Sequence, residues 1–488
     1  MWPAVATTLA TAACHPAAPS NRPASPASSA VPALHATIDG ILASPALEHS
    51  FWGVLVTSLK TGETLYSLNA RKLMMPASNM KIVTLAAAAE RLGWDFRYET
   101  RLFASGPIES GTLQGDLVVV GSGDPSVTDK EAETLFADWA ARLRAAGVRA
   151  IAGRLIGDDD AFEDLGLGFG WSWDDLPDDY AAGVSALQFN ENAVRVTIAP
   201  GPAAGDAAGV SVSPPAGGLT VVSGVTTGAA GGAPSIATSR LPGSMRLELR
   251  GSIPASAPPA TLTVSVENPT LFFAGALRDA LIEHGIDVRG AAVDIDDVRD
   301  APPRPSAPLV SYRSPPLSTL AVRLMKVSQN LYAETFLKTL CPEAPRTSDC
   351  GRREVASVLK RWGIGSDALI QRDGSGLSRY DYVTADALAA ILTHVDRDER
   401  LRGPFEAALP IAGRDGTLAN RMRGTPAEGN ARAKTGSMSN VRGLSGYVTT
   451  ADGEPLVFSI LSNNFETPAA TVNGAADQIV VALASFKR

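Results

Sequence analysis

The sequence predicts an α+β fold in which one antiparallel sheet, flanked by helices, combines strands from both ends of the chain. Two strand-like runs enclose a turn at 60–63, and three more lie between 432 and 462, before a final helix at 469–486. Helical patterns occupy much of the segment from 317 to 395. Because helices separate the two groups of strands, the expected sheet forms only when the chain returns to its beginning.

The middle of the chain has a different pattern, which predicts inserted β-rich domains. From about 98 to 299, strand-like runs alternate with turns rich in Gly and Pro, and one helix is expected from Pro269 to His284. A Pro-rich joint at 301–308 marks the return to the main domain. The expected division is a disordered tail or export-signal remnant at 1–33, a main domain formed by 34–97 and 300–488, an inserted domain formed by 98–190 and 263–299, and a smaller inserted β-rich domain at 191–262.

Composition limits the classes of protein to which the chain could belong. Its 488 residues fit two or three domains, and 45% hydrophobic with 19% charged residues is a normal globular balance. The formal net charge is −8 and no long basic run occurs, which argues against nucleic acid as a partner. Composition does not determine the oligomeric state.

The first 33 residues are rich in Ala, Pro and Ser and contain no acidic side chain, a composition that does not support a packed core. The stretch Thr11–Cys14 partly matches the small residues that precede the lipidated cysteine of bacterial lipoproteins. The segment is therefore either the remnant of an export signal, with peripheral or lipid-anchored membrane association through Cys14, or an Ala-rich tail without function. No apolar run of transmembrane length follows it.

Cys341 and Cys350 enclose eight residues, two of them proline, which suggests a surface loop that a disulfide closes. Such a bond needs an oxidising compartment, so it would fit a protein of the periplasm or the cell exterior. Two free thiols are the alternative. No CxxC motif and no histidine pair with metal-ligand spacing occurs, so we expect neither a metal nor another cofactor.

Ser78 and Lys81 are the first candidates for catalysis. They open an apolar helical segment that ends at Gly93, and positions three apart share one helix face, so the lysine can reach the serine hydroxyl. Serine acyl transfer without histidine needs a nucleophile, a base, N–H donors for the oxyanion and a cation for the substrate carboxylate. The helix start supplies N–H groups, and burial should lower the pKa of Lys81 so that some neutral amine exists.

Spacing alone does not single out this pair, because Ser357 and Lys360 have the same spacing inside an amphipathic helix. The order of the motifs is more specific. The first pair is followed by Ser328-Gln329-Asn330 after a helix, and then by Lys434-Thr435-Gly436-Ser437 on a strand. The same three elements in this order occur in penicillin-binding proteins and serine β-lactamases.

Longer stretches resemble the D-alanyl-D-alanine carboxypeptidase/endopeptidase family, the class C low-molecular-mass penicillin-binding proteins. The matching segments are PASNMKIVT, GDLVVVGSGDPSVT, VSALQFNEN, VSQNLYAE, RDGSGLSR, AGRDGTLANR and ARAKTGSMSNVRGLSGYV. The resemblance runs from about residue 38 to the end of the chain. It implies a β-lactamase/transpeptidase-like main domain, and it fits the 246 residues between Lys81 and Ser328, where this family places extra domains.

The resemblance also implies a serine D-Ala-D-Ala carboxypeptidase, with D,D-endopeptidase activity as well, that acts on peptidoglycan stem peptides and is acylated by β-lactams. Ser78 would be acylated, Lys81 would take its proton, and Ser328 with Lys434 would protonate the leaving amine. Asn330 would hold Lys81 and the substrate amide. The backbone N–H groups of Ser78 and Ser437 would form the oxyanion hole. The residues expected to bind the substrate on the strand are Lys434, Thr435, Gly436 and Ser437.

Two further residues are candidates for recognition of a substrate side chain. Arg379 follows the turn 373–378, which we expect to be structural, and Asp159 belongs to an acidic run of the inserted domain. Together they would suit the zwitterionic end of a diaminopimelate side chain; the alternatives are a structural ion pair and a solvated turn.

Two other functions remain possible for the whole chain. A β-lactamase uses the same acylation chemistry, but the long insertion argues against it. A catalytically silent wall-binding protein would need neither lysine, and the complete motif set argues against that interpretation.

Overall fold

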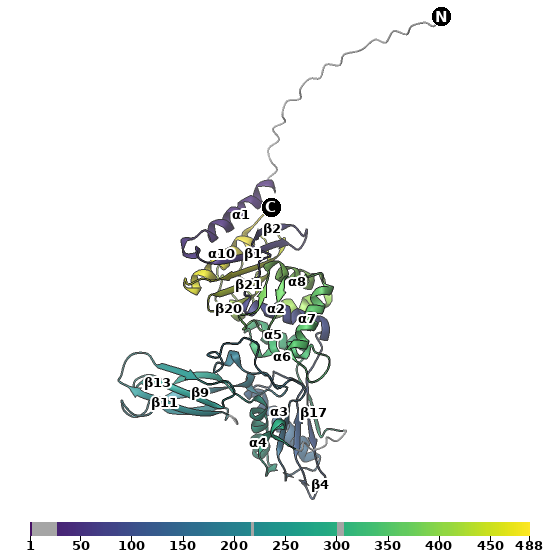
Figure 1. Ribbon diagram of the computed structural model, residues 1–488, viewed down its shortest axis with the longest axis vertical. Coiled ribbons are helices and arrows are strands. Elements are labelled where there is room, and N and C mark those ends of the chain that lie inside the picture. The colour runs from purple at the N-terminus through teal and green to yellow at the C-terminus, as the bar shows by residue number, and fades with distance from the viewer. Residues whose placement is uncertain (2–26, 216–218, 300–306) are drawn as a thin grey trace.

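The computed structural model describes residues 1, 27–215, 219–299 and 307–488. It confirms the predicted α+β class. The main domain contains the first and last helices, α1 (Ala27–Leu42) and α10 (Ala469–Ser485). In Figure 1 this domain lies at one end of the described chain, and the inserted domains lie at the other.

The main sheet has five antiparallel strands in the order β2-β1-β22-β21-β20. They are β1 (Phe51–Ser58), β2 (Thr64–Leu68), β20 (Arg432–Met438), β21 (Val441–Thr449) and β22 (Pro455–Asn463). As the sequence predicts, the N-terminal hairpin joins the C-terminal strands, because β1 lies beside β22. Strand β20 is at the edge of the sheet, so its outer side can face a bound peptide.

The two faces of this sheet pack against different helices. On β1, Val54 and Val56 share a core with α1 and α10, whereas Leu55 belongs to the core on the opposite face, as the period of two requires. The helices of that second face are α2 (Met80–Leu92), α5 (Leu317–Lys326), α6 (Asn330–Thr339), α7 (Ser348–Arg361), α8 (Ala385–Arg397) and α9 (Glu399–Ala408). Helix α2 is the most central, since every residue from Met80 to Ala89 is buried.

The first inserted domain is rich in strands, as expected, but it contains two helices where the sequence indicated one. Its sheets have the orders β16-β8-β6-β3-β17 and β15-β7-β5-β4. The strands are β3 (Glu99–Ala104), β4 (Ile108–Glu109), β5 (Thr112–Leu113), β6 (Leu117–Val120), β7 (Ala150–Ile151), β8 (Leu155–Asp158), β15 (Asp287–Val288), β16 (Ala292–Asp294) and β17 (Val310–Arg313). The expected helix is α4 (Pro269–Glu283), and the additional one is α3 (Asp129–Ala145), whose N-cap Thr128 accepts from the Glu131 N–H.

The boundary between the first inserted domain and the main domain lies later in the chain than predicted, because of strand β17. This strand pairs with β3, so the chain leaves the inserted domain after Arg313 rather than at residue 300. Most of the Pro-rich joint, residues 300–306, lies outside the described residues.

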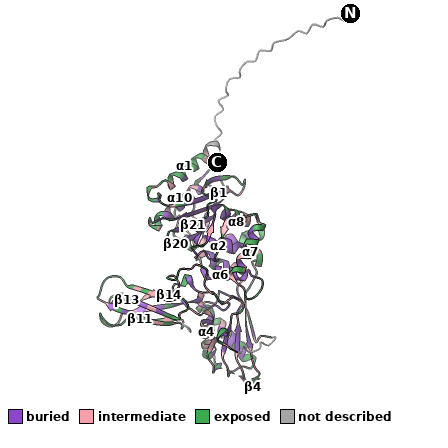
Figure 2. Ribbon diagram, viewed as in Figure 1, coloured by how far each residue is buried: buried purple, intermediate pink, exposed green. Residues whose placement is uncertain are grey.

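The second inserted domain consists of two three-stranded sheets and projects from the rest of the molecule in Figure 1. Its strands are β9 (Ala193–Ala199), β10 (Gly209–Ser213), β11 (Thr220–Gly228), β12 (Ser235–Ser239), β13 (Arg246–Pro254) and β14 (Ala260–Ser265). Val196, Val225 and Leu249 share one core with α3 and α4, so the two inserted domains pack together. Figure 2 shows that burial is densest in the main sheet and its helices.

The main domain begins before residue 34, its predicted start. Helix α1 begins at Ala27, inside the segment 1–33 that we expected to be disordered, and Leu34 and Ile38 of this helix pack against α10. Their apolar side chains, four apart, form the stripe that holds the helix on the sheet. Cys14 lies outside the described residues.

Cys341 and Cys350 form a disulfide that joins the end of α6 to the first turn of α7. In the part of the chain that the structure describes, none of the helices combines the length and the apolar character needed to cross a membrane.

Candidate active site

Ser78 and Lys81 lie where a short 3-10 helix, η2 (Ala77–Asn79), runs into the buried helix α2. The Lys81 Nζ donates to the Ser78 Oγ at 2.9 Å, to the Asn330 Oδ1 at 2.6 Å and to the Ser375 carbonyl oxygen at 2.9 Å. Lys81 is completely buried. Burial lowers the pKa of Lys81 to about 7, although the carboxyl of Asp373 opposes this shift.

Two glycines let the surrounding chain approach the nucleophile closely. A Cβ on Gly436 of β20 would lie 2.6 Å from the Pro76 carbonyl oxygen, and a Cβ on Gly376 would lie 1.9 Å from the Ala77 carbonyl oxygen. Gly376 also has a φ of 82°, a conformation that side chains disfavour. The edge strand and the 373–378 turn therefore contact both sides of the segment that holds Ser78.

Ser328 and Lys434 form a second serine–lysine pair beside the first. The Lys434 Nζ donates to the Ser328 Oγ at 2.7 Å and to its neighbour's carbonyl oxygen, that of Thr435, at 2.9 Å. Lys434 is fully buried, and burial first, then the nearby charge of Lys81, lower the pKa of Lys434 well below its usual value. Ser328, between α5 and α6, has a φ of 64°, which costs about 1–3 kcal/mol for a residue other than glycine.

Asn330 is the first residue of α6 and connects the lysine to the inserted domain. Its Oδ1 accepts from Lys81, while its Nδ2 donates to the Tyr180 carbonyl oxygen at 2.7 Å. The segment around Tyr180 belongs to the inserted domain and thus forms one wall of the site.

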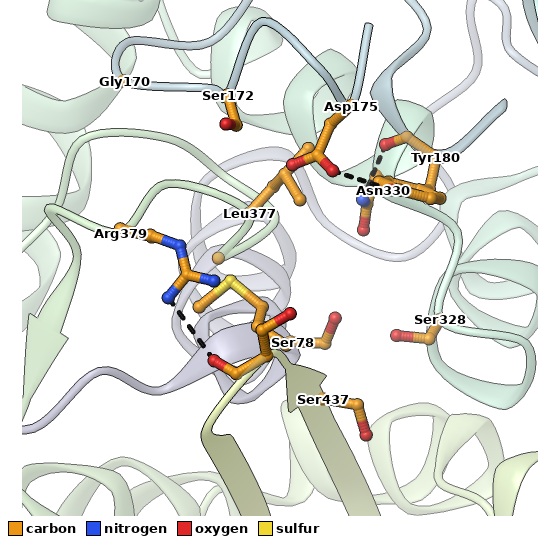
Figure 3. A pocket seen from close by; sticks show the side chains of 13 residues that line it. Ser78, Gly170, Ser172, Asp175, Tyr180, Ser328, Asn330, Leu377, Arg379 and Ser437 are labelled. Atoms are coloured by element: carbon orange, nitrogen blue, oxygen red, sulfur yellow. Dashed lines mark hydrogen bonds between the residues drawn. The ribbon is translucent and has the colours of Figure 1, made fainter. Parts of the chain in front are cut away.

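The residues enclose a cavity of about 390 Å³. Figure 3 shows Ser78, Ser328 and Ser437 around its lower part and Arg379 at its side. The lining residues, with the contribution of the inserted domain first, are Gly170, Ser172, Asp175, Tyr180, Ser78, Ser328, Asn330, Gly376, Leu377, Arg379, Ser437, Met438 and Ser439. The cleft therefore lies between the edge strand β20, the serine motifs and the inserted domain.

The other residues predicted on the strand have distinct environments. Ser437 lines the cavity, whereas the Thr435 side chain is nearly buried and its Oγ1 donates to the Thr417 Oγ1 at 2.8 Å. Gly436 lies between them, against η2.

Asp159 does not line the cavity, contrary to expectation. Its Oδ2 accepts from the Ser185 Oγ at 2.8 Å and the Thr270 Oγ1 at 2.6 Å, and burial raises the pKa of this carboxyl. It follows β8 directly and turns toward the start of α4. The acidic residue in the cavity is Asp175, which accepts from the Tyr180 hydroxyl at 2.8 Å. The sequence offered no signal that distinguished Asp175 from the other acidic residues of the inserted domain.

Arg379 does line the cavity, where its Nη1 donates to the Ser439 carbonyl oxygen at 3.4 Å. The turn before it is held by its own side chains, but it also contacts the site, since its Ser375 carbonyl oxygen accepts from Lys81. Asp373 accepts from the N–H groups of Gly376 at 2.6 Å and Ser378 at 2.7 Å, and from the Trp171 indole N–H at 2.9 Å.

The competing pair is far less suited to catalysis. Ser357 and Lys360 are both exposed on α7, and the Ser357 Oγ accepts from the Arg361 guanidinium.

A serine hydroxyl beside a buried lysine, a second serine–lysine pair and an edge strand define a serine acyl-transfer enzyme of the penicillin-binding class. The model of the D-Ala-D-Ala carboxypeptidase 3 (S13) family matches residues 34–486, and the chain belongs to this family.

Individual relatives agree with this membership. A D-alanyl-D-alanine carboxypeptidase of an Actinomadura species is 37% identical over 467 residues, covering 93% of this chain and 85% of that protein. The D-alanyl-D-alanine carboxypeptidase DacB of Haemophilus influenzae is 28% identical over 426 residues, covering 86% and 87%. The crystal structure of penicillin binding protein 4 (dacB) from Haemophilus influenzae matches with a TM-score of 0.82 at 26% identity, covering 92% of this chain and 99% of that one. The chain is thus a serine-type D-Ala-D-Ala carboxypeptidase, a hydrolase that acts on peptidoglycan.

Proposed function

We propose that the cleft cuts the bond between the two terminal D-alanines of a stem peptide through an acyl-enzyme on Ser78. The observation that supports this proposal best is the environment of the Lys81 Nζ. A neutral amine has two N–H groups and one lone pair. Asn330 Oδ1 and the Ser375 carbonyl oxygen accept the two N–H groups, so the lone pair is left for the Ser78 hydroxyl proton.

The acylation step then moves two protons. As the Ser78 oxygen bonds to the substrate carbonyl, its proton passes to Lys81. As the C–N bond breaks, the Ser328 hydroxyl gives a proton to the leaving amine and regains one from Lys434, which donates to it in the free enzyme. Water then attacks the ester carbonyl and gives a proton, through Ser328, to Lys434, while Lys81 returns its proton to the Ser78 oxygen as the ester bond breaks, so both lysines and Ser78 are restored.

Charge development on the substrate is met by groups around the nucleophile. The backbone N–H groups of Ser78 and Ser437 would form the oxyanion hole, and one such donor is typically worth about 3 kcal/mol. The substrate's terminal carboxylate would bind Lys434, Thr435 and Ser437 through charge-assisted hydrogen bonds. Gly436 carries no side chain that would separate β20 from η2, so the strand lies close to the nucleophile.

The third residue of the stem would extend toward Arg379. This guanidinium and the Asp175 carboxylate both line the cavity (Figure 3), so a side chain that ends in an ammonium and a carboxylate, as in diaminopimelate, would find a partner for each. Asp175 takes the place that the sequence suggested for Asp159.

The same chemistry would serve a D,D-endopeptidase, because the leaving amine is then the side-chain amine of a neighbouring stem. It would also open a β-lactam ring, and the Haemophilus influenzae protein has been solved in complex with a β-lactam.

The Cys341–Cys350 disulfide supports placement in the periplasm or the cell exterior. Lipid anchoring through Cys14 is a further part of this proposal.

Mass spectrometry of the protein after incubation with penicillin tests the proposal. We expect one adduct, mapped to the peptide that contains Ser78, that disappears in Ser78→Ala and persists in the matched variant Ser357→Ala. An adduct on Ser357, or none on folded protein, would contradict it. Adduct loss within seconds would indicate a β-lactamase. Release of D-alanine from a pentapeptide, compared with cleavage of cross-linked dimers, separates the two peptidase activities.

A further inference from the structure

Glu334 is a buried carboxylate that the proposed steps do not use. It lies on α6 one turn after Asn330, and only 3% of it is exposed. Its Oε2 accepts from the Gly374 N–H and its Oε1 from the Ser375 N–H, each at 2.8 Å. Both oxygens therefore hold the same two-residue segment of the 373–378 turn.

This segment directly contacts the lysine. The Ser375 carbonyl oxygen accepts from the Lys81 Nζ, so the two bonds to Glu334 fix the residue that supplies one of the three acceptors around the amine. Asn330, four residues earlier on the same helix, supplies another acceptor. Helix α6 thus determines both acceptors that leave the lone pair for Ser78, one through Asn330 and the other through Glu334.

The turn has little room for another conformation. A Cβ on Gly374 would lie 2.5 Å from the Ala333 carbonyl oxygen of α6, and the Thr84 Oγ1 of α2 donates to the Gly374 carbonyl oxygen at 2.7 Å. The segment is thus enclosed between two helices. Asp373 holds the far side of the peptide unit that carries the Ser375 carbonyl, through the Gly376 N–H at 2.6 Å, so loss of the Glu334 contacts would release its near side and displace the carbonyl oxygen from Lys81 without a full rotation.

The two N–H contacts favour the ionised carboxylate, and they oppose burial and the charge of Asp373, which raise the pKa of Glu334. Two backbone N–H groups need two acceptor oxygens, which a carboxylate provides and a carboxamide does not. A glutamine would turn its NH₂ donor toward one of the two N–H groups, and that buried donor would lose its partner.

We propose that Glu334 is a positioning residue for acylation: it aims the Ser375 carbonyl at Lys81 and so orients the amine lone pair toward Ser78. The inference rests on the proposed role of Lys81 as the base. Because Glu334 does not line the cavity, its replacement should slow the acylation step and leave the preceding binding step unchanged.

The test compares Glu334→Gln with Asp124→Asn in the full chain, by stopped-flow acylation with a fluorescent penicillin. Asp124 is a matched control, because it is a buried carboxylate that accepts a main-chain N–H, that of Ser126, in the inserted domain. We expect the saturating acylation rate of Glu334→Gln to fall about 100-fold, the loss typical of a misplaced catalytic group, with the dissociation constant of the initial complex within about threefold of the parent. Asp124→Asn keeps one oxygen as the acceptor for Ser126 and should acylate at the parental rate.

A parental acylation rate in folded Glu334→Gln would overturn the proposal, and so would a loss that resides in the initial binding constant. If that variant does not fold, Glu334→Asp keeps the charge and both oxygens on a shorter side chain. An acylation rate below the parent supports the proposal, and an unchanged rate contradicts it. Lys81→Met tests the proposed base separately from the role of Glu334. If Lys81→Met acylates at the parental rate, Lys81 is not the base. If Lys81→Met does not acylate while Glu334→Gln is fully active, only the role of Glu334 is refuted.

Discussion

The carboxylate of Glu191, in the inserted domain, accepts a 2.8 Å hydrogen bond from the side-chain amide of Gln329, which lies between Ser328 and Asn330. Glu191 also binds the Arg323 guanidinium through two contacts, at 2.7 and 2.9 Å. The Gln329 Oε1 in turn caps α6. The inserted domain therefore holds the loop that presents two side chains of the site, one of them, Ser328, in a strained conformation.

Removing the Glu191 carboxylate should impair catalysis more than stability. Glu191→Ala frees Gln329, so Ser328 can relax from its left-handed conformation and lose its alignment with Lys434. We expect acylation by penicillin to slow by about tenfold or more, since small displacements of reacting groups are costly. The free energy of unfolding should fall by only about 1 kcal/mol, because Arg323 is half exposed and such pairs contribute little.

Glu248→Ala is the control for this variant. Glu248 also accepts from two arginines, Arg246 and Arg250, but on β13 of the projecting domain. Its loss should leave the acylation rate at the parental value. Equal rates in the two variants would show that the link between the domains does not hold the loop.

Much of this arrangement follows from the sequence because it depends on local order. Ser78 lies at the start of a recognisable helix, Ser328 follows another and Lys434 lies on a strand, and the hydrophobic pattern that places those elements is strong. The assembly of one sheet from both ends of the chain is also implied, whereas the pairing of β1 with β22, which leaves β20 at the edge, is a tertiary contact.

Other parts of the site depend on tertiary contacts that the sequence pattern does not record. The Ser375 acceptor is a backbone carbonyl, which every residue has, and only the turn conformation aims it at Lys81. Asp159 and Asp175 are both acidic residues in irregular segments. Asp159 is turned away from the cavity by its bond to Thr270, which is distant in sequence, and Asp175 is held in the cavity by its bond to Tyr180, which no sequence motif marks. Helix α3 was missed although Thr128 and Glu131 match a helix start, because neighbouring strand patterns dominated that region.

Acylation should depend on pH through Lys81. Burial lowers the pKa of this lysine to about 7, so the neutral amine, the form that takes the Ser78 proton, predominates above that pH. We expect the rate of penicillin acylation to rise with pH, with a midpoint near 7. A rate that is flat between pH 5.5 and about 8.5 would exclude Lys81 as the titrating base.

The same pKa shift predicts a stability effect of defined sign. Between about 7 and 10.5 the unfolded chain holds a proton on Lys81 that the folded protein has released, so stability rises with pH across this interval. Lys81→Met removes this contribution. Urea unfolding at pH 7 and pH 9 should therefore show a smaller gain in stability for Lys81→Met than for the parent, and an equal gain would place the Lys81 pKa at its ordinary value.

Arg379 should affect the choice of substrate without affecting the chemistry. Its guanidinium lines the cavity and makes no contact with Ser78 or Lys81 in the structure. We expect Arg379→Ala to raise KM about tenfold for a stem peptide whose third side chain ends in a carboxylate, consistent with the loss of one charge-assisted hydrogen bond. The matched peptide with a lysine at that position, and penicillin itself, should react at parental rates; equal losses for all three would indicate a structural role instead.

The approach of β20 to the nucleophile can be tested with one methyl group. A Cβ on Gly436 would lie 2.6 Å from the Pro76 carbonyl oxygen and 2.8 Å from the Asn79 amide, so Gly436→Ala must push the strand away from η2. We expect a loss of about 1–3 kcal/mol in the free energy of unfolding, together with slower acylation, because the Ser437 N–H moves with the strand. Gly474→Ala provides the opposite case, since Gly474 lies inside α10 with open space around its Cβ position and should gain about 0.5–1 kcal/mol. A Gly436→Ala protein that acylates at the parental rate would show that the strand does not need this close contact to place its oxyanion donor.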